Sequence, residues 1–313
     1  MKTCNTILIA GASGFLGRSL TNILIENGYE VVALSRRVNE SSSSKVVWNP
    51  QENYIDIQKL LQLAPHGFDA VINLAGENLA SKRWDADRME KLKTSRINAT
   101  KLIAHKISDG TIQTSVFLSA SATGFYGDRG DEILTEESSG GTGFLAELCR
   151  AWENASELDN RTDIRVAKLR TGLVLDTHEG ALARMLPIFK MGMGGKLGSG
   201  MHFYPWIVLE DFLRAILYVI EGYDSNKAIE GAVNIVSQNP VRNSEFTFAF
   251  AKALNRPSLL TVPRLALTLA LGKIANEALL TSQRAIPKML YDAGFEFKYA
   301  TINTAMLHIL GQS

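Results

Sequence analysis

Short apolar runs alternate with amphipathic stretches through the first half of the chain. The stretch after the first run carries Leu16, Leu20 and Leu24 at helical spacing and ends at Gly28, a residue typical of helix C-termini. Continuous apolar strands separated by helices are typical of a parallel sheet with helices on both faces. The pattern therefore predicts an α/β fold built on a Rossmann-type, doubly wound parallel sheet. Its strands are expected at residues 6–10, 30–34, 70–74, 115–118 and 164–169.

The pattern changes after about Gly172. Several glycines crowd residues 192–200, ahead of a mixture of short strands and helices that includes an apolar run at residues 232–235. We therefore expect two regions of different character. The first is a Rossmann domain over residues 1–172, to which later segments return, and the second is a smaller α+β substrate region with C-terminal helices over residues 173–313.

A glycine motif stands between the first predicted strand and the helix that follows it. It has the form G-x-x-G-x-x-G. In such a turn the first glycine permits a tight bend, the second lets backbone amides approach a pyrophosphate, and the third lets the helix pack closely on the sheet. The N-terminus of the helix then favours the phosphate charges. The motif predicts a dinucleotide site formed by Gly11, Ser13, Gly14, Phe15, Leu16 and Gly17.

The residues after the second predicted strand distinguish the two nicotinamide cofactors. An NAD site places Asp or Glu about 20 residues beyond the glycines, where it holds the ribose 2′-hydroxyl. This chain has Ser35 and Arg36 there, followed by Arg37. A carboxylate would repel a 2′-phosphate, whereas a hydroxyl and a guanidinium bind it through charge-assisted hydrogen bonds. We therefore predict NADP(H) as the cofactor; the alternative is that both arginines are solvated loop charges.

Charge and composition narrow the range of partners. The net charge of +1 argues against a broad nucleic-acid surface, which needs a marked basic excess. The histidines show no spacing typical of a metal site, so we expect no metal. The most membrane-like segment, residues 259–280, is interrupted by Arg264 and Lys273 and reads as a buried or interface helix. We expect a soluble, cytoplasmic protein with no membrane partner.

Further motifs follow the predicted strands. Asn73-Leu74-Ala75-Gly76 follows one strand, and the run from Ser119 to Gly127 follows another. With these segments the chain resembles the extended short-chain dehydrogenase/reductases, and more closely their atypical epimerase-like subfamily 39U. The resemblance covers essentially the whole chain and extends over residues 83–84, 95–98, 144–147, 152–153, 194–200, 205–207 and 282–295.

The resemblance implies positions for further cofactor-binding residues. It implies that Leu74, Ala75 and Gly76 lie along the adenosine half of the cofactor. Arg96 is expected near the ribose and pyrophosphate, although a solvated helix face is the alternative. Val174 is expected where the backbone of related proteins flanks the nicotinamide. In the second region, His202, Trp206 and Arg242 are candidates for the wall of a substrate cleft; the alternative is that they are core and capping residues.

One departure from the family pattern bears on catalysis. Working members carry a Tyr four residues before a Lys, and this sequence has Phe144 and Leu148 in those places. Neither side chain can carry a proton, and no other Y-x-x-x-K occurs in the chain. Ser121 and Tyr126 are the nearby hydroxyls that could reach a substrate, so they are the candidate catalytic residues. The alternative is that both hydroxyls satisfy hydrogen bonds inside the fold.

Two functional hypotheses follow. The first is an NADP(H)-dependent, epimerase-like oxidoreductase that acts on a small polar substrate, with nucleotide-sugars as one candidate class. The second is a non-catalytic regulatory or structural protein that has kept the cofactor. The retained Ser121 and the glycine-rich second region favour the first hypothesis, and the altered helix favours the second. Either protein could be a monomer or a homodimer.

Overall fold

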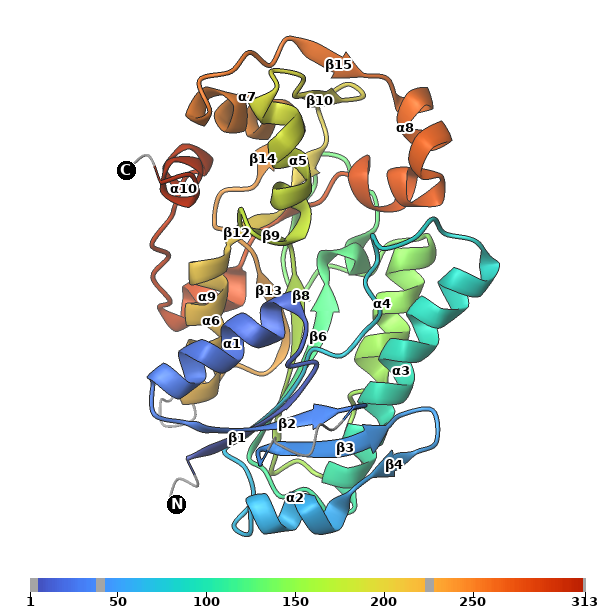
Figure 1. Ribbon diagram of the computed structural model, residues 1–313, viewed down its shortest axis with the longest axis vertical. Coiled ribbons are helices and arrows are strands. Elements are labelled where there is room, and N and C mark those ends of the chain that lie inside the picture. The colour runs from blue at the N-terminus through green and yellow to red at the C-terminus, as the bar shows by residue number, and fades with distance from the viewer. Residues whose placement is uncertain (1–4, 38–42, 223–227, 312–313) are drawn as a thin grey trace.

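The fold is organised around one eight-stranded sheet. The computed structural model describes residues 5–37, 43–222 and 228–311, and Figure 1 shows the sheet between two layers of helices. All neighbouring strands are parallel except β3 and β4. The strand order is β13-β8-β6-β5-β1-β2-β3-β4. The strands are β1 (Thr6–Ala10), β2 (Glu30–Ser35), β3 (Lys45–Asn49), β4 (Tyr54–Ile55), β5 (Ala70–Asn73), β6 (Val116–Ala122), β8 (Arg165–Thr171) and β13 (Gly231–Ile235).

The strand order confirms the doubly wound arrangement expected from the sequence. The chain adds β2 and β3 on one side of β1 and then crosses to add β5, β6 and β8 on the other side. The order therefore reverses between β1 and β5. In open α/β sheets, ligands bind at such a switch point, outside the carboxyl ends of the strands.

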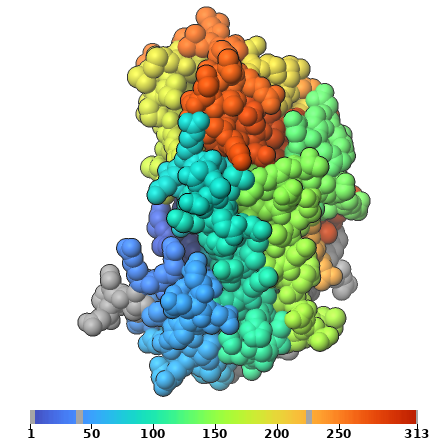
Figure 2. Space-filling view, turned by 90° about the vertical axis from the view of Figure 1, so that its right-hand side faces the viewer, coloured from blue at the N-terminus to red at the C-terminus, as the bar shows by residue number. Residues whose placement is uncertain are grey.

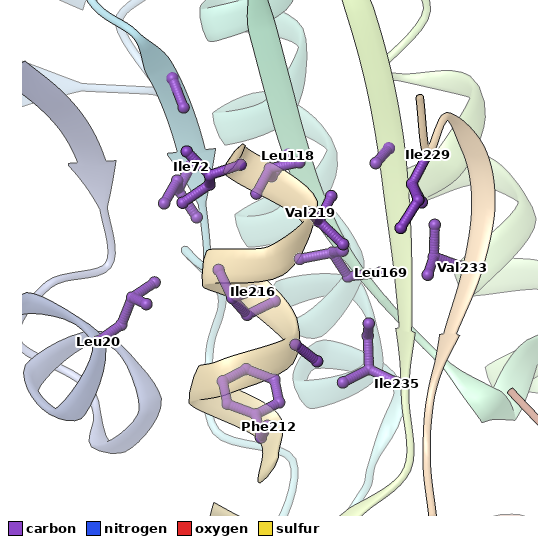
Figure 3. Packing of buried hydrophobic residues seen from close by; sticks show 14 of the residues in the cluster. Leu20, Ile72, Leu118, Leu169, Phe212, Ile216, Val219, Ile229, Val233 and Ile235 are labelled. Atoms are coloured by element: carbon purple, nitrogen blue, oxygen red, sulfur yellow. The ribbon is translucent and has the colours of Figure 1, made fainter. Parts of the chain in front are cut away.

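Both faces of the sheet are buried, which explains the continuous apolar strands. In β1, Ile7 and Ile9 pack against α1 (Phe15–Glu26), α6 (Leu209–Glu221) and α9 (Lys288–Ala293). Leu8 and Ala10 point to the other face, which is covered by α2 (Ile57–Leu63) and α3 (Ala86–Ser108), with α4 (Phe144–Asn154) beside α3. Figure 3 shows how α6 lays Phe212, Ile216 and Val219 across the strands on the first face.

The second region has its own apolar core beyond the carboxyl ends of the strands (Figure 1). Trp206, Phe246 and Phe250 are fully buried in it. Its helices are α5 (Gly180–Lys190), α7 (Asn243–Ala253), α8 (Arg264–Leu271) and α10 (Ile302–Ile309). Its strand pairs are β9 (Leu173–Leu175) with β12 (Trp206–Val208), β10 (Gly195–Leu197) with β15 (Leu260–Val262), and β11 (Phe203–Tyr204) with β14 (Val241–Arg242). A further pair joins β7 (Ile133–Leu134) to β16 (Arg284–Ala285).

Two features of the fold differ from the pattern-based expectations. The edge strands β3 and β4 were not predicted, because β4 has only two residues and the apolar run of β3 is only three residues long, between Lys45 and Asn49. The prediction of one continuous helix over residues 259–280 is wrong, since Pro263 and Gly272 delimit the short α8 and a π-helical turn, η2 (Ala275–Leu279), follows it. The α8 helix is also not buried, because Leu265 and Leu269 are exposed, and the interface alternative stays a prediction. Within the described residues, no helix has the length and apolarity needed to cross a membrane.

Candidate functional site

The glycine turn packs against the backbone that follows β5. Gly11 has φ +87°, and a Cβ there would come within 2.7 Å of the carbonyl carbon of Leu74 and 2.9 Å of the amide nitrogen of Ala75. A Cβ on Gly17 would lie 2.2 Å from the backbone oxygen of Gly11. The two glycines therefore allow β1, α1 and the residues after β5 to meet at the switch point.

The N-terminus of α1 is arranged to receive an anion. Its N-cap is Gly14, which provides no side-chain cap, and the first turn contains no acidic residue. A Cβ on Gly14 would have only one neighbour, the Gly11 oxygen at 3.4 Å. Backbone amides at such an uncapped terminus are donors for a pyrophosphate. The residues present therefore fit a dinucleotide cofactor.

Charged residues gather where β2 and β5 end. Ser35 closes an Asx-like turn, since its Oγ accepts from the Arg37 amide at 3.2 Å. The exposed Arg36 lies near Glu77, and the Arg88 guanidinium donates to the Glu77 carboxylate at 2.9 Å. The hydrogen bond from Arg88, with smaller contributions from Arg36 and Arg96, lowers the pKa of Glu77. This end of the site is therefore net positive, as a phosphate would require.

Arg96 is buried rather than solvated. Its side chain is 7% exposed, and it donates to the backbone oxygens of Leu92 at 3.0 Å and Glu77 at 2.9 Å. A Cβ on Gly76 would lie 3.1 Å from the Arg96 side chain, and the guanidinium lies 5.1 Å from the Trp152 ring centroid. Burial lowers the pKa of Arg96 to about 10. Arg96 thus underlies the loop after β5, beside the expected cofactor path.

Ser121 and Tyr126 belong to one buried polar network. The Ser121 hydroxyl donates to Glu153 Oε1 at 2.7 Å. Arg170 donates to both Glu153 oxygens, at 2.9 and 3.0 Å, and to the Tyr126 hydroxyl at 3.1 Å. The Arg170 guanidinium also lies 3.5 Å from the Phe125 ring centroid. Ser121 and Tyr126 are close in the sequence, but the sequence analysis did not identify Glu153 and Arg170 as the residues that connect their hydroxyls.

The Tyr126 hydroxyl is enclosed. The side chain is 0% exposed, and its oxygen lies 2.7 Å from Asn234 Oδ1 and 2.9 Å from the Thr135 carbonyl. Burial raises the pKa of Tyr126, although Arg170 opposes the shift. A phenol in such surroundings holds neighbouring elements together. The prediction that Tyr126 is a catalytic residue has no geometric support, because every hydrogen-bonding position of its hydroxyl is filled.

The positions of the usual Tyr and Lys have become apolar. Leu148 is 4% exposed and packs with Trp84, Leu92 and Leu145, while Phe144 and Ile274 border the same cluster. The rings of Phe144 and Trp84 meet edge to face, with centroids 5.4 Å apart. The segment after α8 therefore closes over this end of α4.

A cavity of about 210 Å³ lies next to Phe144. It is bounded by η1 (Thr123–Tyr126) and the residues after it, by the N-terminus of α4, and by the segment after α8. Glu277 Oε2 accepts a hydrogen bond from the Leu145 amide at 3.2 Å, and a Cβ on Gly143 would lie 3.0 Å from the same oxygen. The polar side chains in the wall are Asp128, Thr142, Asn276, Glu277 and Thr281.

Sequence reasoning missed Glu277. It lies 132 residues from its partner Leu145, and no local pattern marks it. The only signal was the glycine at position 143, whose missing side chain leaves room for a carboxylate.

Two of the expected cleft residues, His202 and Arg242, lie together at the β11–β14 pair, where the Asn243 amide donates to the His202 carbonyl at 2.8 Å. Trp206 is fully buried and donates to the Asn239 carbonyl at 2.9 Å, whereas Arg242 pairs with Asp131 at 2.9 Å. His202 is buried, and burial lowers its pKa. Val174 is 8% exposed and belongs to the same apolar cluster as Phe15. Among the residues that the structure describes, no group of three or more His, Cys, Asp or Glu could hold a metal ion.

The chain matches two protein-family models. Residues 7–235 match the NAD dependent epimerase/dehydratase family, and residues 262–309 match a domain of unknown function, DUF1731. The second match contains α8, η2 and α10. It therefore includes the segment that supplies Glu277 to the cavity.

Curated relatives and solved structures extend the match over almost the whole chain. An epimerase family protein of Mycobacterium leprae is 38% identical over 96% of this chain and 94% of its own length. A chloroplastic SDR39U1 homologue of Arabidopsis thaliana is 34% identical over 97% and 86%. The human SDR39U1 structure with NADPH has a TM-score of 0.86 and 27% identity, and the match covers 98% of this chain and 100% of that one. The chain belongs to the NAD dependent epimerase/dehydratase family and, within it, to the SDR39U1-type proteins.

Proposed function

We propose that this protein is an NADP(H)-dependent oxidoreductase that acts on a small polar substrate held in the cavity beside Glu277. The observation that carries the proposal is the glycine turn, which leaves the N-terminus of α1 without a side-chain cap. The positively charged end of β2 provides the second part of the site. The human SDR39U1 structure, which contains NADPH, supports the same cofactor. The cofactor-binding residues we assign are Gly11, Ser13, Gly14, Phe15, Leu16, Gly17, Ser35, Arg36, Leu74, Ala75, Gly76, Arg96 and Val174.

Arg36 is assigned to the 2′-phosphate. Its side chain is exposed at the end of β2, close enough to Glu77, in the loop after β5, to lower the pKa of that carboxyl, and Glu77 is held by Arg88 from the first turn of α3. Because Glu77 is already paired with Arg88, Arg36 is left to meet a ligand charge. A guanidinium binds phosphate through two parallel hydrogen bonds, which NADH does not offer at this position.

The cavity beside Glu277 is assigned to the substrate. When bound, the nicotinamide supplies or accepts a hydride, and the protein supplies position and a route for the proton. The cavity adjoins Gly143 and Leu145, the neighbours of the residue that replaces the usual Tyr. Glu277 is the carboxylate in its wall that contacts α4, so we assign it the proton-transfer role that Phe144 cannot perform.

The buried hydroxyls keep supporting roles in this proposal. Ser121 fixes Glu153, and Tyr126 ties Arg170 to β13 through Asn234. The network holds η1 against β8, and η1 forms one wall of the cavity. Replacing either hydroxyl should therefore alter the cavity through its wall rather than remove a proton donor.

Calorimetric titration tests the cofactor assignment. NADPH should bind at least tenfold more tightly than NADH, a difference of about 1.4 kcal/mol. Arg36→Asp should abolish or reverse this preference, while Lys252→Met, which removes an exposed charge on α7, should leave it unchanged. Equal affinity of the unaltered protein for both cofactors would show that Arg36 has been assigned wrongly.

A substrate screen separates the enzyme from the non-catalytic alternative. The apolar cluster around Leu148 specifically favours that alternative, because it removes the usual proton relay. Carbonyl compounds and nucleotide-sugars would be screened with NADPH, and any reaction repeated with Glu277→Gln. Loss of turnover by about 10²–10⁴-fold with unchanged NADPH affinity supports the proposal. Tight NADPH binding without turnover of any substrate favours a non-catalytic binding protein.

A further inference from the structure

The end of the molecule around α8 exposes an unusual number of large apolar side chains. Among the described residues, sixteen large hydrophobic side chains are exposed, and ten of them lie within residues 180–209 and 246–276. Leu259 is 91% exposed, Leu265 70% and Leu269 68%. A soluble protein seldom exposes apolar groups so densely unless the surface contacts a partner. The ten are Ile188, Met191, Met193, Met201, Phe248, Leu259, Leu260, Leu265, Leu269 and Leu271.

These two segments lie side by side. β10 pairs in parallel with β15, so that Gly195 is opposite Leu260. A Cβ on Gly192 would lie 3.7 Å from the Pro257 ring, and α8 begins directly after β15. In Figure 1, β10, β15, α7 and α8 form the end of the molecule opposite α2, and Figure 2 shows the orange region around α8 at the surface of that end.

The same two segments carry only positive formal charge. Neither contains an aspartate or a glutamate. Arg184, Lys190, Lys196, Lys252, Arg256, Arg264 and Lys273 supply seven cations, and all but the half-buried Lys196 are exposed. In the described part of the chain, no salt bridge pairs any of the seven. Phe248 lines a cavity with Thr301 and Ile302 at the start of α10, so it is left out of this surface. We call the seven cations and the other nine exposed apolar side chains the cationic apolar surface.

We propose that the cationic apolar surface docks the protein on an anionic lipid bilayer. Exposed leucine and methionine side chains can enter the boundary between headgroups and acyl chains, while the flexible ends of Lys and Arg meet the anionic headgroups. Within α8, Leu265 and Leu269 are one helical turn apart on the same exposed side, whereas Leu267 is buried. Docking of this kind needs no spanning helix, so the finding about spanning segments does not oppose it.

Charge complementarity favours lipid over a second copy of the chain. A twofold interface would place this surface against itself, and seven cations would then face seven cations. Four glutamates, Glu179, Glu210, Glu245 and Glu277, border the two segments in the sequence. Glu179 is paired with Arg18 and Glu210 with Lys298, both outside the surface. The proposal revises the sequence-based expectation that the protein has no membrane partner, and it is independent of the proposed chemistry.

Vesicle pelleting with the full chain tests the proposal. We expect pelleting with phosphatidylcholine vesicles that contain about one third phosphatidylglycerol, and little with phosphatidylcholine alone. Leu265→Ser/Leu269→Ser should weaken binding at least tenfold. Arg264→Ser and Lys273→Ser should each weaken it by about fivefold. The matched control is Ile25→Ser/Leu61→Ser, which replaces two apolar residues of similar exposure on α1 and α2 and should bind as the unaltered protein does.

Three results would overturn the proposal. The first is failure of the unaltered protein to pellet with anionic vesicles, or equal pelleting with neutral ones. The second is unchanged binding of the Leu265→Ser/Leu269→Ser variant, which would identify a polyanion site without lipid insertion. The third is a dimer in sedimentation analysis that the same double substitution dissociates, which would assign the surface to a second copy. Unchanged thermal melting of each variant would confirm that these exposed changes leave the fold intact.

Discussion

Replacing Leu148 with lysine would put the usual family residue back into a place that this fold has made apolar. Leu148 is 4% exposed, and its neighbours Trp84, Leu92 and Leu145 are all buried. A lysine held there loses its hydration, so its pKa in the folded protein falls below the unfolded value of about 10.4. A depression of about 3 units corresponds to about 4 kcal/mol of lost stability at neutral pH.

The sign of the pH dependence makes this prediction specific. A depression of about 3 units puts the folded-state pKa of the lysine at about 7.4, whereas the unfolded-state pKa is about 10.4, so between these two pH values the folded protein binds fewer protons than the unfolded one. The stability deficit of Leu148→Lys should therefore be largest near pH 7 and should shrink as the pH rises towards 10. Denaturant unfolding at both pH values measures it, with Leu148→Met as the control, since this change should cost less than about 1.5 kcal/mol.

The same variant bears on catalysis. Phe144→Tyr combined with Leu148→Lys restores the Tyr and Lys of the family pattern in the sequence. We expect no gain in turnover, because the lysine is either neutral in the apolar cluster or displaces part of that cluster. If Leu148→Lys lowers the free energy of unfolding by less than about 1 kcal/mol, and by the same amount at both pH values, the reasoning is refuted. That result would show that the lysine reaches water or the cofactor from Leu148, and that the cluster is not a barrier.

Further predictions concern the glycine turn and the buried network. Gly17→Ala should lower the free energy of unfolding by about 1–3 kcal/mol and abolish NADPH binding in calorimetry, because its Cβ would lie 2.2 Å from a backbone oxygen. Gly14→Ala should mainly weaken cofactor binding. Arg170→Met should cost about 3–5 kcal/mol in denaturant unfolding, since it leaves the buried Glu153 carboxylate unpaired, and adding Glu153→Gln should recover part of the loss. Tyr126→Phe should cost about 1–3 kcal/mol with unchanged NADPH affinity, and a selective loss of affinity would contradict its structural role.

Local sequence was sufficient to predict the cofactor end of the site. The apolar runs, the glycine motif and Arg36 each occupy a few consecutive residues, so the local structure that they indicate can be predicted from adjacent residues alone. The strands of the parallel sheet therefore appear close to where the pattern predicts them, and Gly11 meets Leu74 as the motif requires. The cofactor roles themselves stay predictions until binding is measured.

Only the tertiary structure could reveal which polar side chains contact one another near the cavity. Ser121, Glu153 and Arg170 come from β6, α4 and β8, and Glu277 reaches Leu145 from a segment that follows α8. No periodicity relates such positions, because their proximity results from sheet order and from how the second region folds back.

The same distinction applies to the exposed and buried apolar residues. By itself, the sequence determined that the chain forms strands and helices with apolar faces, including the leucine-rich stretch around α8. It could not determine that Leu148 is sealed in a cluster whereas Leu265 and Leu269 face outward. Whether a helix face is covered depends on the element packed against it, and that element is chosen by long-range contacts rather than by the spacing of leucines along the chain.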